Sequence, residues 1–357
     1  MSHSRILSTA DQGELLEPDQ LEQLEQSFRR WAAKAGSGRQ LSRARILIIF
    51  LLIRYTGAKL NEVLRLNKET DIKPEQRLIR YRGGEAEEEE PREAPLSQSL
   101  YEEIDAFLRL AENAPPEGDN DDCVDGEHKH PFAIDPAFVR RKFYERARDC
   151  GLTPARCGPE MIRKGRALEL LRNNMPLPVV QRLLGHSTPN LTASHLTFSR
   201  DEMRQVAKWY VERESGRKTS ARNSFFGKVQ TLLQDAVQSL VEIVTPDGDH
   251  VRTMITNSSA ERLGLKPGRL VSAEIKAPWL TLESADRPGL SSADNNYEGI
   301  ISRIVRGKVN VECEVRIHEG IHLCAILSAP GFDALGVKEK DAVRVLFSCH
   351  AVVLHVD

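Results

Sequence analysis

The stretch RKGRALELLRNNMPLPVVQRLLGH, residues Arg163–His186, carries the pattern from which the fold of the first half of the chain can be inferred. Its apolar residues recur every three or four positions, as they do along one face of an α-helix. Asn173, Asn174 and two prolines interrupt this spacing. The stretch is therefore expected to form two consecutive helices.

The segments on either side of this stretch show the same helical spacing. We predict further helices over Asp19–Gly36, Leu41–Gly57, Ala58–Leu66, Ser97–Ala114, Asp135–Gly151 and Ser199–Ser215. One β-hairpin with an acidic tip is predicted from RLIRYRGG (Arg77–Gly84) and REAPLS (Arg92–Ser97). The first half is thus expected to be mostly α-helical with a small β-sheet.

The pattern changes after Ser220, where short β-rich runs alternate with glycine, aspartate and asparagine turns. This part repeats with a constant offset of 72 residues, so that Ala221–Val229 aligns with Ala293–Ile301 and Ser259–Val271 aligns with Gly331–Val343. A repeat that keeps its register without gaps indicates two copies of one small domain. Each copy is expected to be an OB-like barrel of about five strands, which makes this a multidomain chain.

Charge is distributed unevenly along the chain, although the net charge is only −2. Residues 139–218 contain 17 Lys and Arg against 8 Asp and Glu, whereas residues 1–138 carry a net charge of −9. Much of the negative charge lies in Glu85–Glu90 and Asp119–Asp125. A basic segment in such a chain is typical of binding to a polyanion such as DNA, although a solvated helical surface gives the same pattern.

The composition argues against several other classes of protein. The longest apolar run, Ile46–Ile53, is too short to span a bilayer. The N-terminal residues lack the apolar core of a signal peptide, so we expect a cytoplasmic protein with no membrane partner. The six cysteines show no metal-ligand spacing, and no further ligand is evident near the pair His128 and His130, so no metal site is expected.

Two segments of the first half resemble motifs of the tyrosine recombinases of the phage integrase family. TGAKLNEVLRL (Thr56–Leu66) is similar to the family motif TGxRxxELxxL, and Arg163–His186 is similar to the second motif, an arginine followed by LGH. The resemblance spans about residues 40–205 and implies the fold of the family's catalytic domain. In that family two arginines bind the scissile phosphate and a tyrosine attacks its phosphorus.

Only part of this catalytic set has a counterpart in the sequence. The first arginine falls on Lys59, a histidine falls on Glu160 and the tyrosine falls on His195, while the lysine of the hairpin has no clear counterpart. We therefore expect a domain that has lost catalysis and still binds DNA. Its candidate phosphate contacts are Lys59, Arg163, Lys164, Arg166, Arg182 and His186.

The second half resembles the Mop domains, TOBE-type modules that bind molybdate. The resemblance rests on Thr219–Val229, Ile255–Val271 and IKAPWLTL (Ile275–Leu282), and the tandem pair is similar to the sensor of ModE-type regulators. A tetrahedral dianion needs cationic, hydroxyl and backbone N–H donors with no carboxylate nearby. The resemblance assigns oxyanion binding to Ser220, Ala221, Arg222, Asn223, Ser259, Lys276 and Ala277.

The second copy lacks most of these donors. At the offset of 72, Arg222 becomes Asp294, Lys276 becomes Ser348 and Ser259 becomes Gly331. We therefore expect the first repeat to supply the main ligands. In the family such sites form between Mop units packed across a dimer, so the resemblance also implies a homodimer.

These observations predict a domain order and a function. We expect a helical segment over 1–38, an integrase-like domain over 39–210, a linker over 211–219 and Mop domains over 220–286 and 291–357. The chain resembles tungstate-responsive transcriptional regulators, in which tungstate or molybdate would control the affinity for a double-stranded DNA operator and repress oxyanion transport genes. Two alternatives stay open, an oxyanion-gated recombinase and an oxyanion storage protein.

Overall fold

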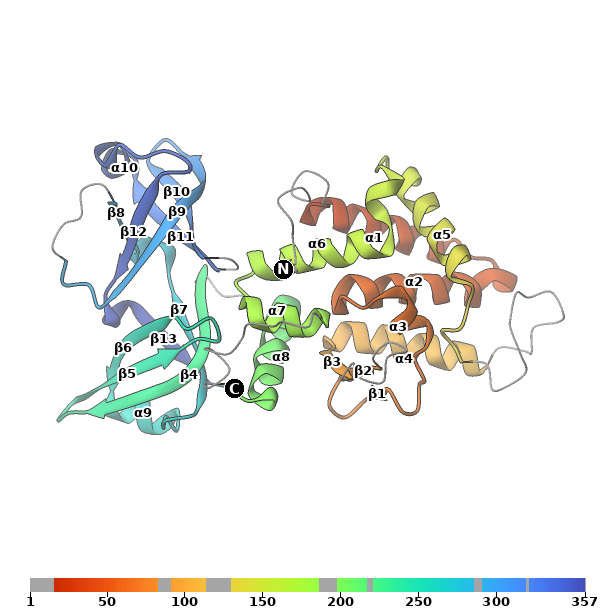
Figure 1. Ribbon diagram of the computed structural model, residues 1–357, viewed down its shortest axis with the longest axis horizontal. Helices are drawn as coiled ribbons and strands as arrows, with labels where there is room; N and C mark the ends of the chain where they lie inside the picture. Colours follow the sequence, from red (N-terminus) through yellow and green to blue (C-terminus); the bar gives the residue numbers. More distant parts are fainter. Residues whose placement is uncertain are drawn as a thin grey trace, which may run out of the picture. The chain divides into compact units, whose positions relative to one another are not determined.

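The structure is a computed structural model of the chain (Figure 1). It describes residues 16–82, 91–113, 130–185, 198–216, 221–285, 291–318 and 321–356. The contacts between residues divide the chain into two compact units. The second unit comprises Leu170–Val179, Asn190–Val206 and Lys218–Asp357, and the first unit comprises the other residues.

The first unit consists mainly of helices. These are α1 (Pro18–Ala33), α2 (Gln40–Thr56), α3 (Leu60–Leu64), α4 (Gln98–Glu112) and α5 (Pro136–Asp149), with the short turns η2 (Ser37–Arg39) and η3 (Pro154–Cys157). Helices α1 and α5 both begin at a proline, whose missing N–H would have no partner in the first turn anyway. The rings of Phe28, Phe50 and Phe143 pack with centroids 4.1, 5.1 and 5.8 Å apart, and they join α1, α2 and α5.

A small antiparallel sheet accompanies these helices (Figure 1). Its strands β1 (Ile72–Lys73), β2 (Leu78–Tyr81) and β3 (Arg92–Pro95) lie in the order β1-β2-β3. Tyr81 pairs with Arg92 and Leu78 with Pro95, which confirms the hairpin predicted from the sequence. Its acidic tip lies outside the described residues.

Helices α6 (Pro159–Arg172), α7 (Leu177–Leu184) and α8 (Arg200–Gly216) carry residues of both units. Helices α6 and α7 are the pair predicted over Arg163–His186. Helix α8 continues to Gly216, so it occupies most of the residues that were expected to form a linker. None of the helices among the described residues is both long enough and apolar enough to cross a bilayer.

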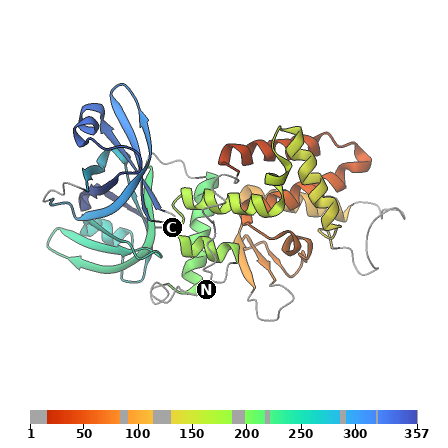
Figure 2. The same cartoon turned by 45° about the horizontal axis from the view of Figure 1, so that its top comes forward.

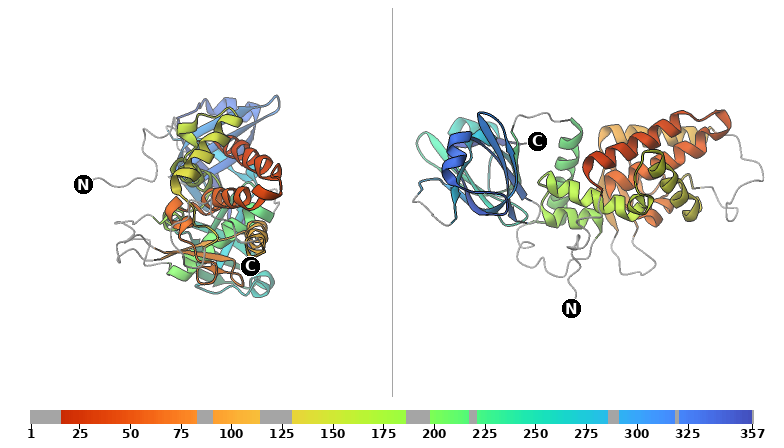
Figure 3. Two further views of the ribbon diagram at one scale, coloured as in Figure 1. Left: turned by 90° about the vertical axis from the view of Figure 1, so that its right-hand side faces the viewer. Right: turned by 90° about the horizontal axis from the view of Figure 1, so that it is seen from above.

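The second unit contains two five-stranded antiparallel sheets that curl around one continuous core of buried apolar residues (Figure 2; Figure 3, right). The first repeat forms β4 (Asn223–Gln234), β5 (Gln238–Val244), β6 (His250–Thr256), α9 (Asn257–Arg262), β7 (Leu270–Ile275), η4 (Ala277–Trp279) and β8 (Thr281–Ser284). The second forms β9 (Asn295–Arg306), β10 (Asn310–His318), β11 (Ile321–Ser328), α10 (Ala329–Leu335), β12 (Ala342–Phe347), η5 (Cys349–Ala351) and β13 (Val352–His355). The predicted fold class, a mostly α part followed by two small OB-like barrels, is confirmed.

The two repeats exchange their last strands. The sheet orders are β13-β7-β4-β5-β6 and β11-β10-β9-β12-β8, so β8 pairs with β12 of the second repeat and β13 pairs with β7 of the first. Two asparagines at equivalent positions, Asn223 and Asn295, strengthen this link. Each side chain exchanges two hydrogen bonds with the backbone of one residue in the other repeat, Cys324 for Asn223 and Arg252 for Asn295.

The glycines that the repeat aligned, Gly227 and Gly299, occupy equivalent crowded positions in β4 and β9. A Cβ on Gly227 would lie 2.4 Å from the carbonyl oxygen of Val244, and one on Gly299 would lie 2.7 Å from a methyl group of Val315. Because the neighbouring strand approaches this closely, only glycine fits at both positions.

Candidate functional site

Helix α6 places Arg163 beside the end of α7, and its guanidinium group is buried there. The side chain donates from Nε to the carbonyl of Gly57 at 2.9 Å and from Nη2 to the carbonyl of Leu184 at 2.5 Å. Its Nη1 lies 3.2 Å from Oε1 of Glu160, one turn earlier on the same helix. Burial lowers the pKa of Arg163, while the charge of Glu160 acts in the opposite direction.

A second arginine, Arg92 at the start of β3, reaches the same end of α7. It donates to the carbonyl of Leu183, and its Nη2 lies 2.7 Å from Oε2 of Glu62 in α3. Its guanidinium group also lies over the ring of Tyr81, with its carbon 4.4 Å from the centroid. The last two residues of α7 therefore accept hydrogen bonds from two arginines, one from β3 and one from α6.

The remaining candidate DNA contacts are spread over this region. Lys59 precedes α3 and is half-buried, with its backbone N–H donating to Glu62 at 2.6 Å. Lys164 is half-buried in α6 and Arg182 is exposed on α7. His186 and His195 lie outside the described residues. The structure thus brings Lys59 and Arg163 into one neighbourhood, together with Arg92.

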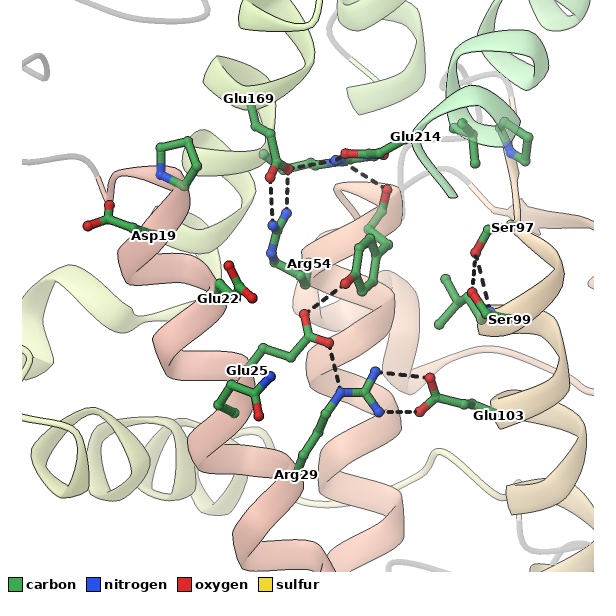
Figure 4. A pocket seen from close by; sticks show the side chains of 17 residues that line it. Asp19, Glu22, Glu25, Arg29, Arg54, Ser97, Ser99, Glu103, Glu169 and Glu214 are labelled. Atoms are coloured by element: carbon green, nitrogen blue, oxygen red, sulfur yellow. Dashed lines mark hydrogen bonds and ion pairs between the residues drawn. The ribbon is translucent and has the colours of Figure 1, made fainter. Parts of the chain in front are cut away.

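The expectation for Arg166 needs correction. This residue is fully buried, and its guanidinium group donates to Glu169 at 2.6 Å and to both carboxylate oxygens of Glu214 at 2.6 and 2.7 Å. Glu169 in turn accepts two hydrogen bonds from Arg54, and Figure 4 shows this group at one end of a pocket lined by α1, α2, α4, α6 and α8. Arg166 joins helices and is not placed to contact a phosphate.

Apart from Ser259, the predicted oxyanion ligands that the structure describes lie where β4 begins and β7 ends, and they are Ala221, Arg222, Asn223, Lys276 and Ala277. Asn223 pairs with Ile275, so the residues just outside this pair, Arg222 and Lys276, are also neighbours. Arg222 is half-exposed, Lys276 is exposed with its ammonium 5.6 Å from the ring centroid of Trp279, and Ala277 begins η4. Ser220 lies outside the described residues.

Two observations limit which side chains of this group can serve an anion in a single chain. The amide of Asn223 is fully buried and is used by the backbone of Cys324. The guanidinium group of Arg222 makes two hydrogen bonds to the carboxylate of Glu312 in β10, one of them 2.9 Å long. Glu312 therefore holds Arg222 in the way that a bound anion would.

Ser259 lies at the opposite end of β4. It stands in the first turn of α9, where its hydroxyl accepts a hydrogen bond from the Thr256 hydroxyl. The backbone N–H of Asn257, at the start of α9, donates to the carbonyl of Val237 in the β4–β5 turn. Strand β4 has 12 residues, which at about 3.3 Å per residue corresponds to roughly 40 Å of strand. Within one chain Ser259 is therefore separated from Arg222 and Lys276.

The equivalent positions of the second repeat form a closed arrangement. Asp294, the counterpart of Arg222, accepts a hydrogen bond of 2.8 Å from the backbone N–H of Cys349, the counterpart of Ala277. This hydrogen bond is the main cause that lowers the pKa of Asp294. A carboxylate of the chain itself thus binds the N–H at the position of Ala277 in the second repeat.

The two halves of the chain match two different family models. The model of the phage integrase family matches residues 14–202, which is more than half of the chain. The chain belongs to this family. The model of the TOBE domain matches residues 219–282, the repeat that carries Arg222 and Lys276.

Several known proteins are similar to parts of this phage integrase family member. The DNA-binding transcriptional dual regulator ModE of Escherichia coli is 34% identical over 137 residues, 38% of this chain and 51% of ModE. The tyrosine recombinase XerA of Pyrococcus furiosus is 26% identical over 161 residues, 45% of this chain and 53% of XerA. The chain therefore spans about half the length of these relatives. A solved structure of the molybdate-bound cytoplasmic protein ModG is 31% identical, with a TM-score of 0.38, and covers 40% of this chain and all of ModG.

Sequence reasoning missed Arg92 and Glu62 in the integrase-family half. The acidic tip of the hairpin holds no counterpart of the family's lysine, yet the next basic residue, Arg92, opens β3 and lies near Arg163. The sequence does show Arg92 as a cation directly after the tip. It does not show that Arg92 pairs with Glu62, because this pairing depends on how α3 packs against the sheet.

Proposed function

We propose that this protein is a DNA-binding transcriptional regulator whose operator affinity is controlled by molybdate or tungstate bound at its Mop repeats. The integrase-family half binds DNA without cutting it, and the regulator represses oxyanion transport genes. Bound oxyanion stabilises one of two states of the protein. It can change the DNA affinity by no more than the difference between its own affinities for those two states.

One observation carries the oxyanion assignment. In the second repeat the carboxylate of Asp294 accepts the N–H of Cys349. In the first repeat the equivalent positions hold Arg222 and Ala277, so an arginine replaces the aspartate whose carboxylate binds this N–H. With the exposed ammonium of Lys276, this arrangement favours an external anion at a position that the second repeat fills internally.

The position of Ser259 supports a homodimer. Ser259 cannot reach Arg222 of its own chain, but its helix α9 adjoins a hairpin tip that exposes Leu233 (64%) and Val237 (72%). The second repeat exposes Val305 and Val309 at the equivalent tip. Apolar residues exposed in this way favour packing against a second copy, which would bring Ser259 of one chain to Arg222 of the other.

The partners of the two buried arginines support a loss of catalysis. Arg163 pairs with the carboxylate of Glu160, and Arg92 pairs with that of Glu62. A phosphate that binds either arginine would therefore have to compete with a carboxylate. The side chain of Glu160 is 60% exposed, which puts a negative charge at the surface where a scissile phosphate would lie. DNA binding then relies on exposed cations such as Arg182.

A gel-shift titration tests the regulator. DNA from upstream of oxyanion transport genes should be bound, and micromolar molybdate or tungstate should change its affinity by about tenfold, which corresponds to about 1.4 kcal/mol of coupling. Sulfate should have no such effect. The double variant Arg222→Ala, Lys276→Ala should bind DNA without responding, whereas Lys338→Ala, at an exposed position after α10, should respond normally. Unchanged DNA affinity in the wild type would exclude the sensor role.

A recombinase is the second candidate, because two arginines do gather at the end of α7 beside the family motif. A covalent protein–DNA adduct on a nicked substrate, lost in His195→Ala, would establish it and overturn the proposed loss of catalysis. A storage protein is the third, and it predicts no selective retention of DNA at about 0.15 M salt.

A further inference from the structure

Three side chains that the proposed function does not use meet between the two Mop repeats. Asp247 and Asp249 lie in the β5–β6 turn of the first repeat, and His318 is the last residue of β10 in the second. One ligand atom from each lies within 4.8 Å of the other two. Nε2 of His318 is 2.8 Å from Oδ2 of Asp249.

The turn fixes both aspartates on one side. The backbone N–H of Gly248 donates to the carbonyl of Thr245 at 2.9 Å, and the N–H of Asp249 donates to the Thr245 hydroxyl at 3.0 Å. These bonds close the turn tightly around Thr245. Asp247 and Asp249, two residues apart, therefore both face the end of β10.

One oxygen of the Asp247 carboxyl group lacks a hydrogen-bond donor. Among the described residues, its Oδ2 is buried and has no hydrogen-bond partner. Burial raises the pKa of Asp247 to about 7, although the charge of His318 and the backbone N–H of Leu177 act in the opposite direction. A buried carboxylate oxygen without a donor calls for a proton or a cation.

The repeat does not reproduce this combination of side chains. At the offset of 72 the second repeat has Ile321 where the first has Asp249, and the first repeat has Pro246 where the second has His318. Asp247 alone keeps an acidic counterpart, Glu319. The grouping of two aspartates with a histidine is therefore particular to the turn of the first repeat.

We propose that Asp247, Asp249 and His318 form a binding site for a divalent transition-metal ion. Two carboxylate oxygens and one imidazole nitrogen suit Zn²⁺, Co²⁺ or Mn²⁺ rather than Mg²⁺, which prefers oxygen ligands alone. Ligand atoms around a tetrahedral Zn²⁺ lie about 3.4 Å apart, so the observed separations need only small side-chain rotations.

The site is accessible and has room for more ligands. The side chain of His318 is 34% exposed and that of Asp249 is 13% exposed, while Asp247 closes the inner side. Three protein ligands leave at least one coordination position for water. A bound ion would tie the β5–β6 turn of the first repeat to β10 of the second, and it would act independently of the oxyanion.

Cobalt binding to the full-length protein tests this proposal. After treatment with a chelator, the wild type should bind one Co²⁺ more per chain than Asp247→Asn or His318→Gln, with visible absorption bands that show nitrogen and oxygen ligands. Affinity at this site should fall at least tenfold in both variants. His250→Gln is the matched control, because His250 adjoins Asp249 but pairs with Glu242 at 3.5 Å, and it should bind like the wild type.

Any Co²⁺ bound by cysteines or by other histidines is common to the wild type and the two site variants, so it cancels in the difference between them. Asp247→Asn removes a buried carboxyl without changing its size, so the metal-free variant should unfold at the same temperature as the metal-free wild type. Equal Co²⁺ binding by wild type and variants would overturn the proposal. So would a wild type that binds no ion here, which would mean that the three groups share a proton instead.

Discussion

The ion pair between Arg222 and Glu312 bears directly on how the proposed oxyanion site works. Glu312 belongs to the second repeat and occupies the guanidinium group with two hydrogen bonds. Hydrogen bonding to Glu312 raises the pKa of Arg222, so the cation stays charged at every physiological pH. A dianion that uses Arg222 must therefore replace an internal carboxylate.

We predict that Glu312→Gln tightens oxyanion binding. The competing charge is lost while the shape of the side chain is kept, and a partly exposed pair is worth up to about 1 kcal/mol, or about fivefold in affinity. Calorimetry with molybdate measures this change. Glu298→Gln, which removes a charge from β9 without touching Arg222, should leave the affinity unchanged. Weaker binding in Glu312→Gln would show that Glu312 supports the site rather than competes for it.

Glu169 is the residue whose charge contributes most clearly to the stability of the first unit. Burial alone would raise its pKa, but hydrogen bonds and charges from Arg54 and Arg166 outweigh burial and hold the pKa at about 2. The unfolded value is near 4.5. The folded pKa is thus lowered, so this stabilisation is present above about pH 4.5 and is lost as the pH falls towards 2.

Glu169→Gln should therefore lower the free energy of unfolding by about 3 kcal/mol at pH 7, since it leaves two buried arginines short of a partner. Urea denaturation at several pH values checks this, and the difference from wild type should shrink as the pH falls below about 4.5. Glu112→Gln, at an exposed pair with Lys68, should have little effect at any pH. A pH-independent difference would rule out the charge as the cause.

The same network shows what the sequence can reveal about single residues. The basic character of Arg163–Lys218 is visible in the sequence, but the partners of each cation are not. Arg166 pairs with Glu214, which is 48 positions away, so its burial follows from the packing of α8 against α6. Lys164 on α6 and Arg182 on α7 were predicted as DNA contacts by the same argument, and both side chains are at least partly exposed.

At the level of elements, the helices, the hairpin and the two barrels follow from periodicity and from the repeat. The exchange of β8 and β13 does not, because the two strands are equivalent in sequence and either could complete either barrel. Likewise, the polar residues after Val211 indicated a linker, yet burial of Trp209, Tyr210 and Val211 continues α8 to Gly216.

The strand exchange predicts how one repeat behaves alone. A fragment of residues 221–286 lacks β13, so β7 has an unpaired edge and β8 has no partner. Because β8 is the counterpart of β13, two fragments can exchange their β8 strands, and we expect a dimer by light scattering. Leu282→Asp, at a buried position of β8, should abolish the dimer, whereas Thr281→Asp, at an exposed one, should not. A folded monomer would contradict this prediction.

For the whole molecule, the decisive question is whether two chains share one oxyanion site. Arg222 and Lys276 belong to one end of β4 and Ser259 to the other, so a site that uses all three needs two copies. The variants Arg222→Ala and Ser259→Ala should each lose oxyanion binding as homodimers. In a mixed dimer, however, one chain supplies Arg222 and the other supplies Ser259, which rebuilds one of the two sites.

Equal amounts of these two variants, unfolded and refolded together, should therefore recover about a quarter of the wild-type sites, because half of the dimers are mixed and each has one intact site. Calorimetry with molybdate counts the sites. Arg222→Ala mixed with Lys276→Ala is the control, and it should recover none, since both residues come from the same end of one chain. Recovery in the control but not in the test pair would mean that Arg222 and Lys276 of one site come from different chains. No recovery in either would mean that Ser259 acts within its own chain.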